Sequence, residues 1–276
     1  MWCHIILTWI ISAHISAGCQ KSVAVCFYGL TRSLRNHTYN SIYSNLLAQL
    51  SKQGYQLDIY LHTYNMSKLN NPRSNERNVA LDPDEWRLLE PLRYLIEDAS
   101  SVDKRMNLSY YTKFGNPWRD DPSGLSLRNH LRALNSIETC FSLIEQYMDK
   151  YKYIVFARPD VAYVRPLPNV KRLITNNQTI GVKFIDRFAI GSPIAVRKWA
   201  HRLHSADAFL HSKWDRKTHR ERSKGLHSEN LVKFHLFHSK LTMKEVSGFC
   251  FVRVRAGGCF SKLDCRACHF SSTNMC

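Results

Sequence analysis

The fold is decided by the stretch Tyr151-Lys-Tyr-Ile-Val-Phe-Ala-Arg158-Pro159-Asp160, a strand-like apolar run that ends in a charged pair. A short apolar run closed by a proline is typical of a strand buried on both faces of a parallel sheet. A second strand-like run, Thr179 to Phe184, leads to another charged pair, Asp186-Arg187. Ligands bind beyond the carboxyl ends of the strands in open α/β sheets. The two pairs therefore predict one shared site.

The rest of the chain alternates between strand-like and helix-like segments, which predicts an α/β fold. Further strands are expected at 22–28, 56–62 and 249–254, and helices at 39–52, 126–149, 195–214 and 228–238. Residues 63–80 are polar and rich in Asn, so we expect a surface loop there. Acidic residues at 82–85 indicate a helix start. With 276 residues and no linker or internal repeat, one catalytic domain is the simplest interpretation.

The N-terminus predicts entry into the secretory pathway. Residues 1–18 contain an apolar run that is short for a membrane span, which needs about 20 residues, and they end in small residues that suit cleavage after Gly18. A short signal-anchor is the alternative, because no Lys or Arg precedes the run. We expect the protein in the ER or Golgi lumen or secreted, with membrane attachment only through this segment. N-glycosylation sequons begin at Asn36, Asn65, Asn107 and Asn177.

Cysteines are concentrated at the C-terminus. Five of the nine lie in the last 27 residues, and cleavage after Gly18 would leave eight. An even number in an oxidising compartment predicts a disulfide-pinned tail, whose connectivity the sequence leaves open. Cys265-Arg-Ala-Cys268-His269 also matches a haem-attachment pattern or a small zinc site, but the density of cysteines favours disulfides. The chain is thus divided into residues 19–257 and a cysteine-rich tail, 258–276.

The chain is strongly basic, with 39 Lys and Arg against 22 Asp and Glu and a formal net charge of +17. This balance predicts attraction to an anion, such as a nucleotide-sugar phosphate or an acidic glycan. Basic residues are spread along the chain, with one denser run at 216–224. Nucleic acid is not an expected partner, since no zinc-finger or RNA-binding motif accompanies them. No GxGxxG or Walker sequence is present either, so NAD and ATP chemistry lack their usual sequence motifs.

Residues at the ends of two predicted strands could bind a phosphorylated ligand. Gly29 lets the backbone approach a ligand closely, and Arg32 could pair with phosphate; an ordinary turn with a solvent-exposed Arg is the alternative. Asp160 could hold a divalent ion that bridges two phosphates, with Arg158 neutralising charge. The alternative there is a structural Arg–Asp pair that caps the strand.

Two further positions could provide acid–base groups. Asp186-Arg187 repeats the strand-end pair, and its alternative is a buried ion pair without chemistry. His227-Ser228-Glu229 places an imidazole and a carboxylate at a predicted helix start. Glu229 or His227 could act as a general base or bind acceptor hydroxyls. The alternative is a capped helix whose acidic first turn suits the helix dipole.

Several motifs occur in a fixed order along residues 22–257, namely Phe27-Tyr-Gly29-Leu-Thr-Arg32-Ser33, Asp58-Ile-Tyr-Leu-His62-Thr-Tyr64, Asn71-Pro-Arg73, Arg158-Pro-Asp160-Val, Asp186-Arg187-Phe-Ala-Ile-Gly191 and His227-Ser-Glu229. Together they resemble a family of GT-A-like glycosyltransferases, which use nucleotide-sugar donors. The resemblance implies a Rossmann-like, mixed sheet flanked by helices.

The resemblance also implies roles for the candidate residues. Gly29 and Arg32 would meet the nucleotide, and Asp160 would stand where related enzymes place the Asp-x-Asp that binds Mn²⁺ or Mg²⁺. Arg158 occupies the position of the first Asp, so it would replace part of the metal's charge. Asp186 and Glu229 would activate an acceptor hydroxyl or orient the sugar, beside Arg187.

The predicted function is therefore transfer of a sugar from a nucleotide-sugar donor to a hydroxyl of a glycan or glycoprotein acceptor. Two alternatives remain. One is a secreted, non-catalytic binder of acidic glycans, which would use the same positive charge. The other is a sulfotransferase, for which the sequence shows no convincing phosphate loop.

Overall fold

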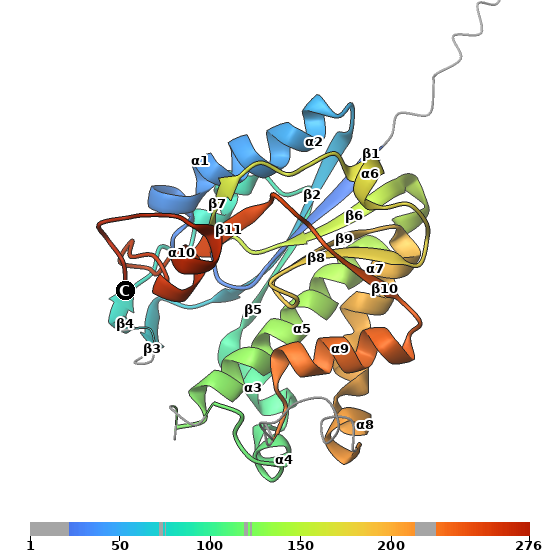
Figure 1. Cartoon of the computed structure of the whole chain (residues 1–276). Coiled ribbons are helices and arrows are strands. Elements are labelled where there is room, and N and C mark those ends of the chain that lie inside the picture. The colour runs from blue at the N-terminus through green and yellow to red at the C-terminus, as the bar shows by residue number, and fades with distance from the viewer. Residues whose placement is uncertain (1–21, 72–73, 75, 119–120, 122, 213–224) are drawn as a thin grey trace, which may run out of the picture.

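A computed structural model describes residues 22–71, 74, 76–118, 121, 123–212 and 225–276 (Figure 1). The predicted signal peptide or signal-anchor at 1–18 and the basic run at 216–224 lie outside the described residues. None of the described helices is long and apolar enough to cross a lipid bilayer.

The described residues form a mixed sheet of seven strands. Their spatial order is β10 (Thr242–Glu245), β8 (Thr179–Lys183), β9 (Phe188–Gly191), β6 (Tyr151–Ala157), β1 (Ser22–Tyr28), β2 (Gln56–Asn65) and β5 (Arg93–Asp98). The four strands from β6 to β5 run parallel, and β9 is antiparallel to both of its neighbours. The predicted α/β class is confirmed, and so are the strands expected at 22–28, 56–62 and 179–184.

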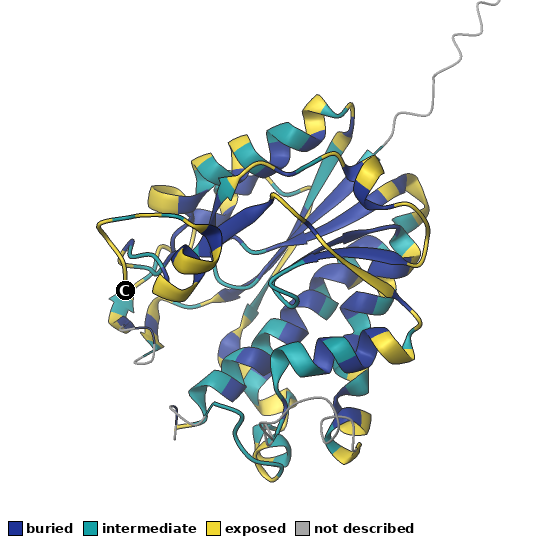
Figure 2. Ribbon diagram, in the orientation of Figure 1, coloured by how far each residue is buried: buried dark blue, intermediate teal, exposed yellow. Residues whose placement is uncertain are grey.

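Helices cover both faces of this sheet, and the alternation of side chains along β1 shows why both faces are apolar (Figures 1 and 2). Val23, Val25 and Phe27 belong to one buried cluster, while Ala24 and Cys26 belong to the other. The first cluster lies under a continuous helical stretch, formed by η1 (Leu34–Thr38), α1 (Tyr39–Ile42), η2 (Tyr43–Leu47) and α2 (Ala48–Lys52). The second is covered by α5 (Leu125–Glu145), α7 (Pro193–Ala200) and α9 (Ser228–His238).

The remaining elements surround this sandwich. They are η4 (Glu85–Leu89), α3 (Ala99–Arg105), α4 (Leu108–Thr112), η5 (Met148–Lys150), α6 (Val170–Leu173), η6 (His201–Ser205), α8 (Ala206–His211) and α10 (Lys262–Cys268), with the antiparallel pair β7 (Val161–Arg165) and β11 (Cys250–Arg253). The helix expected at 195–214 is divided into α7, η6 and α8, and Trp214 lies outside the described residues. Helix α7 begins early because Ser192 accepts a hydrogen bond from the Ala195 amide and Pro193 fits the first turn.

The expected surface loop at 63–80 is wrong. Strand β2 continues to Asn65, and β3 (Lys68–Asn71) and β4 (Glu76–Ala80) form an antiparallel hairpin. A polar hairpin of this kind lacks the apolar alternation that identifies a strand in a sequence. A contact with a distant part of the chain holds the hairpin instead. Glu76 accepts a hydrogen bond from the backbone amide of Ala256, in the C-terminal part of the chain.

Three disulfides form within the described residues. Cys250–Cys268 and Cys259–Cys276 fix the C-terminal tail, which confirms the predicted disulfide-pinned tail. Cys26–Cys140 was not predicted, and it joins β1 to α5 inside the second buried cluster. Because Cys268 is used in a disulfide, the alternatives of haem attachment or a zinc site there are wrong. Bonds of this kind persist in oxidising compartments.

Candidate functional site

One cavity of about 560 Å³ collects the residues that the sequence singled out. All eight candidates line it: Gly29, Arg32, Arg158, Asp160, Asp186, Arg187, His227 and Glu229. The parallel strands β1 and β6 end at the same edge of the sheet, so the segments that follow them meet there. Asp186 and Arg187 lie in the turn between β8 and β9, and His227 and Glu229 lie at the start of α9. Gly29 has φ +95, a backbone conformation that suits glycine.

Asp160 is buried between two guanidinium groups. Its Oδ1 accepts a hydrogen bond from Arg158 Nε at 2.8 Å, and its Oδ2 accepts from Arg158 Nη2 and Arg32 Nη2, both at 2.7 Å. Burial alone would raise the pKa of the Asp160 carboxyl, but Arg158 and Arg32 hold this pKa well below its usual range. Asp160 is therefore a permanent anion at neutral pH that organises two arginines.

This donor set does not fit a divalent ion at Asp160. Mn²⁺ and Mg²⁺ prefer several oxygen ligands, whereas both oxygens of this carboxylate already accept hydrogen bonds from guanidinium groups. Arg255 adds a third positive charge close to the carboxylate. The strand-end Arg–Asp pair, which the sequence left as the alternative at Arg158 and Asp160, describes this geometry.

The β3–β4 hairpin reaches this network through Glu76. Its Oε2 accepts from Arg32 Nη1 at 2.8 Å, and its Oε1 accepts from the Ala256 amide at 2.9 Å. Arg32 is therefore held by two carboxylates, Asp160 and Glu76, and all three side chains are almost completely buried. Arg32 is not the solvent-exposed residue that the sequence left as an alternative.

The C-terminal tail holds a second pair of arginines. Asp264, from α10, accepts from Arg253 Nε at 2.6 Å and from Arg187 Nη1 at 3.0 Å. Burial acts to raise the pKa of Asp264, but these two guanidinium groups lower it overall. Arg187 lies closer to this tail carboxylate than to its neighbour Asp186, whose Oδ1 is 3.8 Å from Arg187 Nε.

Arg255 differs from the other arginines of the cavity because it makes no ion pair with any described residue. Its buried Nε also has no hydrogen-bond partner in the part of the chain that the structure describes. Burial, with Arg32 and Arg253 nearby, lowers the pKa of Arg255 to about 10, so the guanidinium is still charged at neutral pH. We call Arg32, Arg158, Arg253 and Arg255 the cationic group. An unpaired guanidinium at a cavity wall is suited to binding an anion.

A second set of lining residues combines carboxylates with aromatic rings. We call Asp186, Glu229, His130, His227 and Trp118 the carboxylate–aromatic group. The indole of Trp118 stacks on the His227 ring, with centroids 6.1 Å apart. Buried polar atoms without a hydrogen-bond partner among the described residues include Asp186 Oδ1, His130 Nε2 and His227 Nδ1. Burial lowers the pKa of His130 to about 3, so its imidazole is neutral. These unpaired atoms match the hydroxyl groups of a polar ligand.

The lining of the cavity contains more basic than acidic residues. Seven of its lining residues are Lys or Arg, and three are Asp or Glu. Its volume lies within the range of about 300–1,000 Å³ that is typical of small-molecule sites. One part of the wall therefore suits an anion, and the carboxylate–aromatic group suits a neutral, hydroxyl-rich partner.

Sequence reasoning missed six residues of this site: Glu76, Trp118, His130, Arg253, Arg255 and Asp264. A signal existed for Arg255, because Arg253 and Arg255 are separated by one residue in a strand-like run and therefore share a face. Glu76, Asp264 and Trp118 lie in polar segments whose positions depend on distant contacts. A scan against models of known protein families finds no match to this chain, and a search of curated proteins finds no significant relative.

Proposed function

We propose that the protein is a glycosyltransferase that uses a nucleotide-sugar donor. The observation that carries this proposal is the unpaired Arg255, which shares one cavity with Arg32, Arg158 and the carboxylate of Asp186. A nucleotide-sugar has an anionic phosphate or diphosphate beside a hydroxyl-rich ring. Both halves of such a ligand have a matching group in the wall of this cavity.

The reaction would proceed by direct displacement. The acceptor hydroxyl oxygen forms a bond to the anomeric carbon while the bond from that carbon to the phosphate oxygen breaks, and the electron pair leaves with the nucleoside diphosphate. The proton of the hydroxyl passes to Asp186, whose buried Oδ1 has no hydrogen-bond partner among the described residues. Glu229 and His227 then bind hydroxyl groups of the sugar or of the glycan or glycoprotein acceptor.

The cationic group would stabilise the departing diphosphate. Preorganised guanidinium groups in a partly dry site stabilise developing charge strongly, since they need no reorganisation during the reaction. Asp160 and Glu76 hold two of these arginines in position. Because the donor set at Asp160 does not fit a divalent ion, we propose that guanidinium groups take over the charge neutralisation that Mn²⁺ or Mg²⁺ was expected to supply.

The proposed location is the lumen of the secretory pathway or the extracellular space. The three disulfides support an oxidising environment. The four sequon asparagines, at positions 36, 65, 107 and 177, are all exposed on the surface, where an attached glycan has room. A GT-A-type catalytic domain is part of the same proposal, based on the parallel strands that end at the cavity.

A thermal-shift screen tests ligand binding first. Purified full-length protein is heated with UDP-, GDP- and CMP-sugars, in Mn²⁺ or in EDTA, and each melting temperature is compared with the ligand-free protein in the same buffer. We expect one nucleotide class to raise the melting temperature to a similar extent in both buffers, because bound ligand stabilises the folded state. The absence of any shift from all three classes would contradict the proposal.

Two further measurements, heparin binding and a thermal shift with a nucleotide sulfate donor, test the two alternative functions. Heparin affinity that is lost at moderate salt, without any nucleotide shift, would identify a binder of acidic glycans. A shift from a nucleotide sulfate donor alone would identify a sulfotransferase.

The Arg255→Gln variant tests the cationic group. We expect the Kd of the selected nucleoside diphosphate to rise about 10- to 100-fold, because a hydrogen bond to a charged group contributes about 1.5–3 kcal/mol. Isothermal titration calorimetry in EDTA measures this change. Arg87→Gln is the matched control, since Arg87 is an exposed arginine that pairs with Asp84 and does not line the cavity. Equal affinities of Arg255→Gln and wild type would remove Arg255 from the site.

A further inference from the structure

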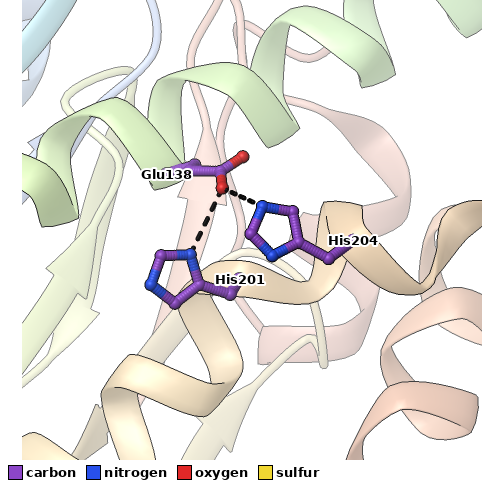
Figure 3. Close-up of side chains that lie close together, drawn as sticks. All are labelled: Glu138, His201 and His204. Atoms are coloured by element: carbon purple, nitrogen blue, oxygen red, sulfur yellow. Dashed lines mark hydrogen bonds and ion pairs between the residues drawn. The ribbon is translucent and has the colours of Figure 1, made fainter.

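Two histidines and a glutamate meet on the surface at a place outside the cavity (Figure 3). His204 Nε2 lies 2.6 Å and His201 Nδ1 lies 3.2 Å from the same carboxylate oxygen, Glu138 Oε1. Glu138 comes from α5, and both histidines come from η6. None of the three lines the cavity.

The local backbone explains why the two rings face the same way. Segment η6 is a 3₁₀ turn, in which residues three apart are eclipsed, so His201 and His204 stack with centroids 5.1 Å apart. Arg202, between them in sequence, is instead fully buried, and its guanidinium lies 3.9 Å from the centre of the Trp199 ring. The turn is thereby anchored. Phe141 of α5 packs edge-on against His201 and restricts that ring as well.

We propose that Glu138, His201 and His204 bind one zinc ion. Their ligand atoms all lie within 4.8 Å of one another, and tetrahedral zinc with bonds of about 2.0–2.2 Å places neighbouring ligands about 3.3 Å apart. The distances from Glu138 Oε1 to the two ring nitrogens, 2.6 and 3.2 Å, are close to that spacing. Two imidazoles with one carboxylate suit Zn²⁺, whereas Mg²⁺ and Ca²⁺ prefer oxygen ligands only.

The ion would connect two elements that cover the sheet. Glu138 lies in the second half of the 21-residue α5, whose first half contributes His130 to the cavity wall, and η6 continues directly from α7. The ion would bond to Glu138 on α5 and to both histidines on η6, and these bonds would fix η6 against α5. The three side chains are between one quarter and two thirds exposed, so solvent can supply the remaining ligand. This site is independent of the proposed transferase reaction.

Calorimetric titration of chelator-treated full-length protein with ZnCl₂ tests the proposal. We expect one ion to bind with a Kd in the micromolar range or below, and a hundredfold excess of zinc over Kd to raise the melting temperature by about 5 °C. His204→Ala removes the most exposed ligand and should weaken binding at least tenfold without affecting the fold. His201→Ala and Glu138→Gln should do the same, and Co²⁺ bound in place of zinc should lose its tetrahedral absorption bands in each variant.

His211→Ala is the matched control, because His211 is an exposed helical histidine that pairs with one carboxylate, Asp207, and forms no metal-binding group with a second imidazole among the described residues. Its zinc affinity should equal that of the wild type. Two results would overturn the proposal: no zinc binding by the wild type, or the same affinity in the wild type and the His204→Ala variant. In either case the cluster is an ion-pair group that holds α5 and η6 together without a metal.

Discussion

Replacing Asp160 by Asn is expected to lower the free energy of unfolding by about 3–5 kcal/mol, the usual cost of removing one partner from a buried ion pair. Asn keeps the shape of the side chain but removes its charge. Arg158 and Arg32 would then face each other without the carboxylate that accepts hydrogen bonds from both. Glu76 neutralises only Arg32. Urea denaturation followed by circular dichroism at pH 7 measures the loss.

Asp84→Asn is the matched control for this variant. Asp84 also pairs with an arginine, Arg87, but both side chains are more than half exposed, so its replacement should cause no measurable change. A loss below about 1 kcal/mol for Asp160→Asn, the median range of surface pairs, would contradict the buried network.

The pH dependence provides a second readout of Asp160. Its pKa is lower in the folded protein than the ordinary value of 3.8, so its contribution to stability is fully present above that value. The contribution is lost as the pH falls below 3.8 toward the folded-state pKa. The stability difference between wild type and Asp160→Asn should therefore be constant from pH 7 to about pH 5 and shrink below pH 4. A difference that stays constant down to pH 3 would contradict the assignment.

Replacing Asp186 by Asn is expected to reduce kcat about 10²- to 10⁴-fold, the range that a general base contributes. The KM for the donor should change little, because the diphosphate is bound by the cationic group and not by Asp186. Initial rates of nucleoside diphosphate release, measured with the donor selected by the thermal-shift screen, report both constants. Asp149→Asn, a change at an exposed position outside the cavity, should leave both constants unaltered.

The stability of the Asp186 variant needs to be checked in the same preparation. Asp186 Oδ1 has no hydrogen-bond partner among the described residues, and its ion pair with Arg187 is long, at 3.8 Å, so loss of the charge should leave the melting temperature close to that of the wild type. Wild-type turnover in Asp186→Asn would assign the base to another residue. Glu229→Gln would then be the next variant to test, since Glu229 lines the same cavity.

The fold was largely predictable because its core strands and its longest helix have clear local patterns of apolar residues. β1 and β6 are continuous apolar runs, and α5 repeats apolar residues at helical spacing. The β3–β4 hairpin was missed because its strands are polar and short. Cys26–Cys140 was missed because cysteines 114 residues apart carry no local signal of pairing.

The candidate site was predictable to the extent that its residues follow strands or begin a helix. Arg158 and Asp160 were found in this way, and β6 does place them at the cavity. Their interaction was foreseen only as the alternative of a structural Arg–Asp pair: the main prediction was a metal ligand at Asp160, whereas the structure surrounds it with guanidinium groups. Glu76 reaches Arg32, and Asp264 reaches Arg187, only through tertiary contacts between residues 44 and 77 positions apart along the chain. Such pairs depend on the completed fold, and no spacing rule identifies them.

The most direct test of the central claim is the release of the nucleotide leaving group (UDP, GDP or CMP) by the wild-type protein. The protein is incubated with UDP-, GDP- and CMP-sugars and a panel of glycan and glycoprotein acceptors, with Mn²⁺ or with EDTA. The account predicts release from one donor class, equal in amount to the sugar transferred, and persistent in EDTA because guanidinium groups neutralise the phosphate of the donor. No release from any donor in either buffer would contradict it.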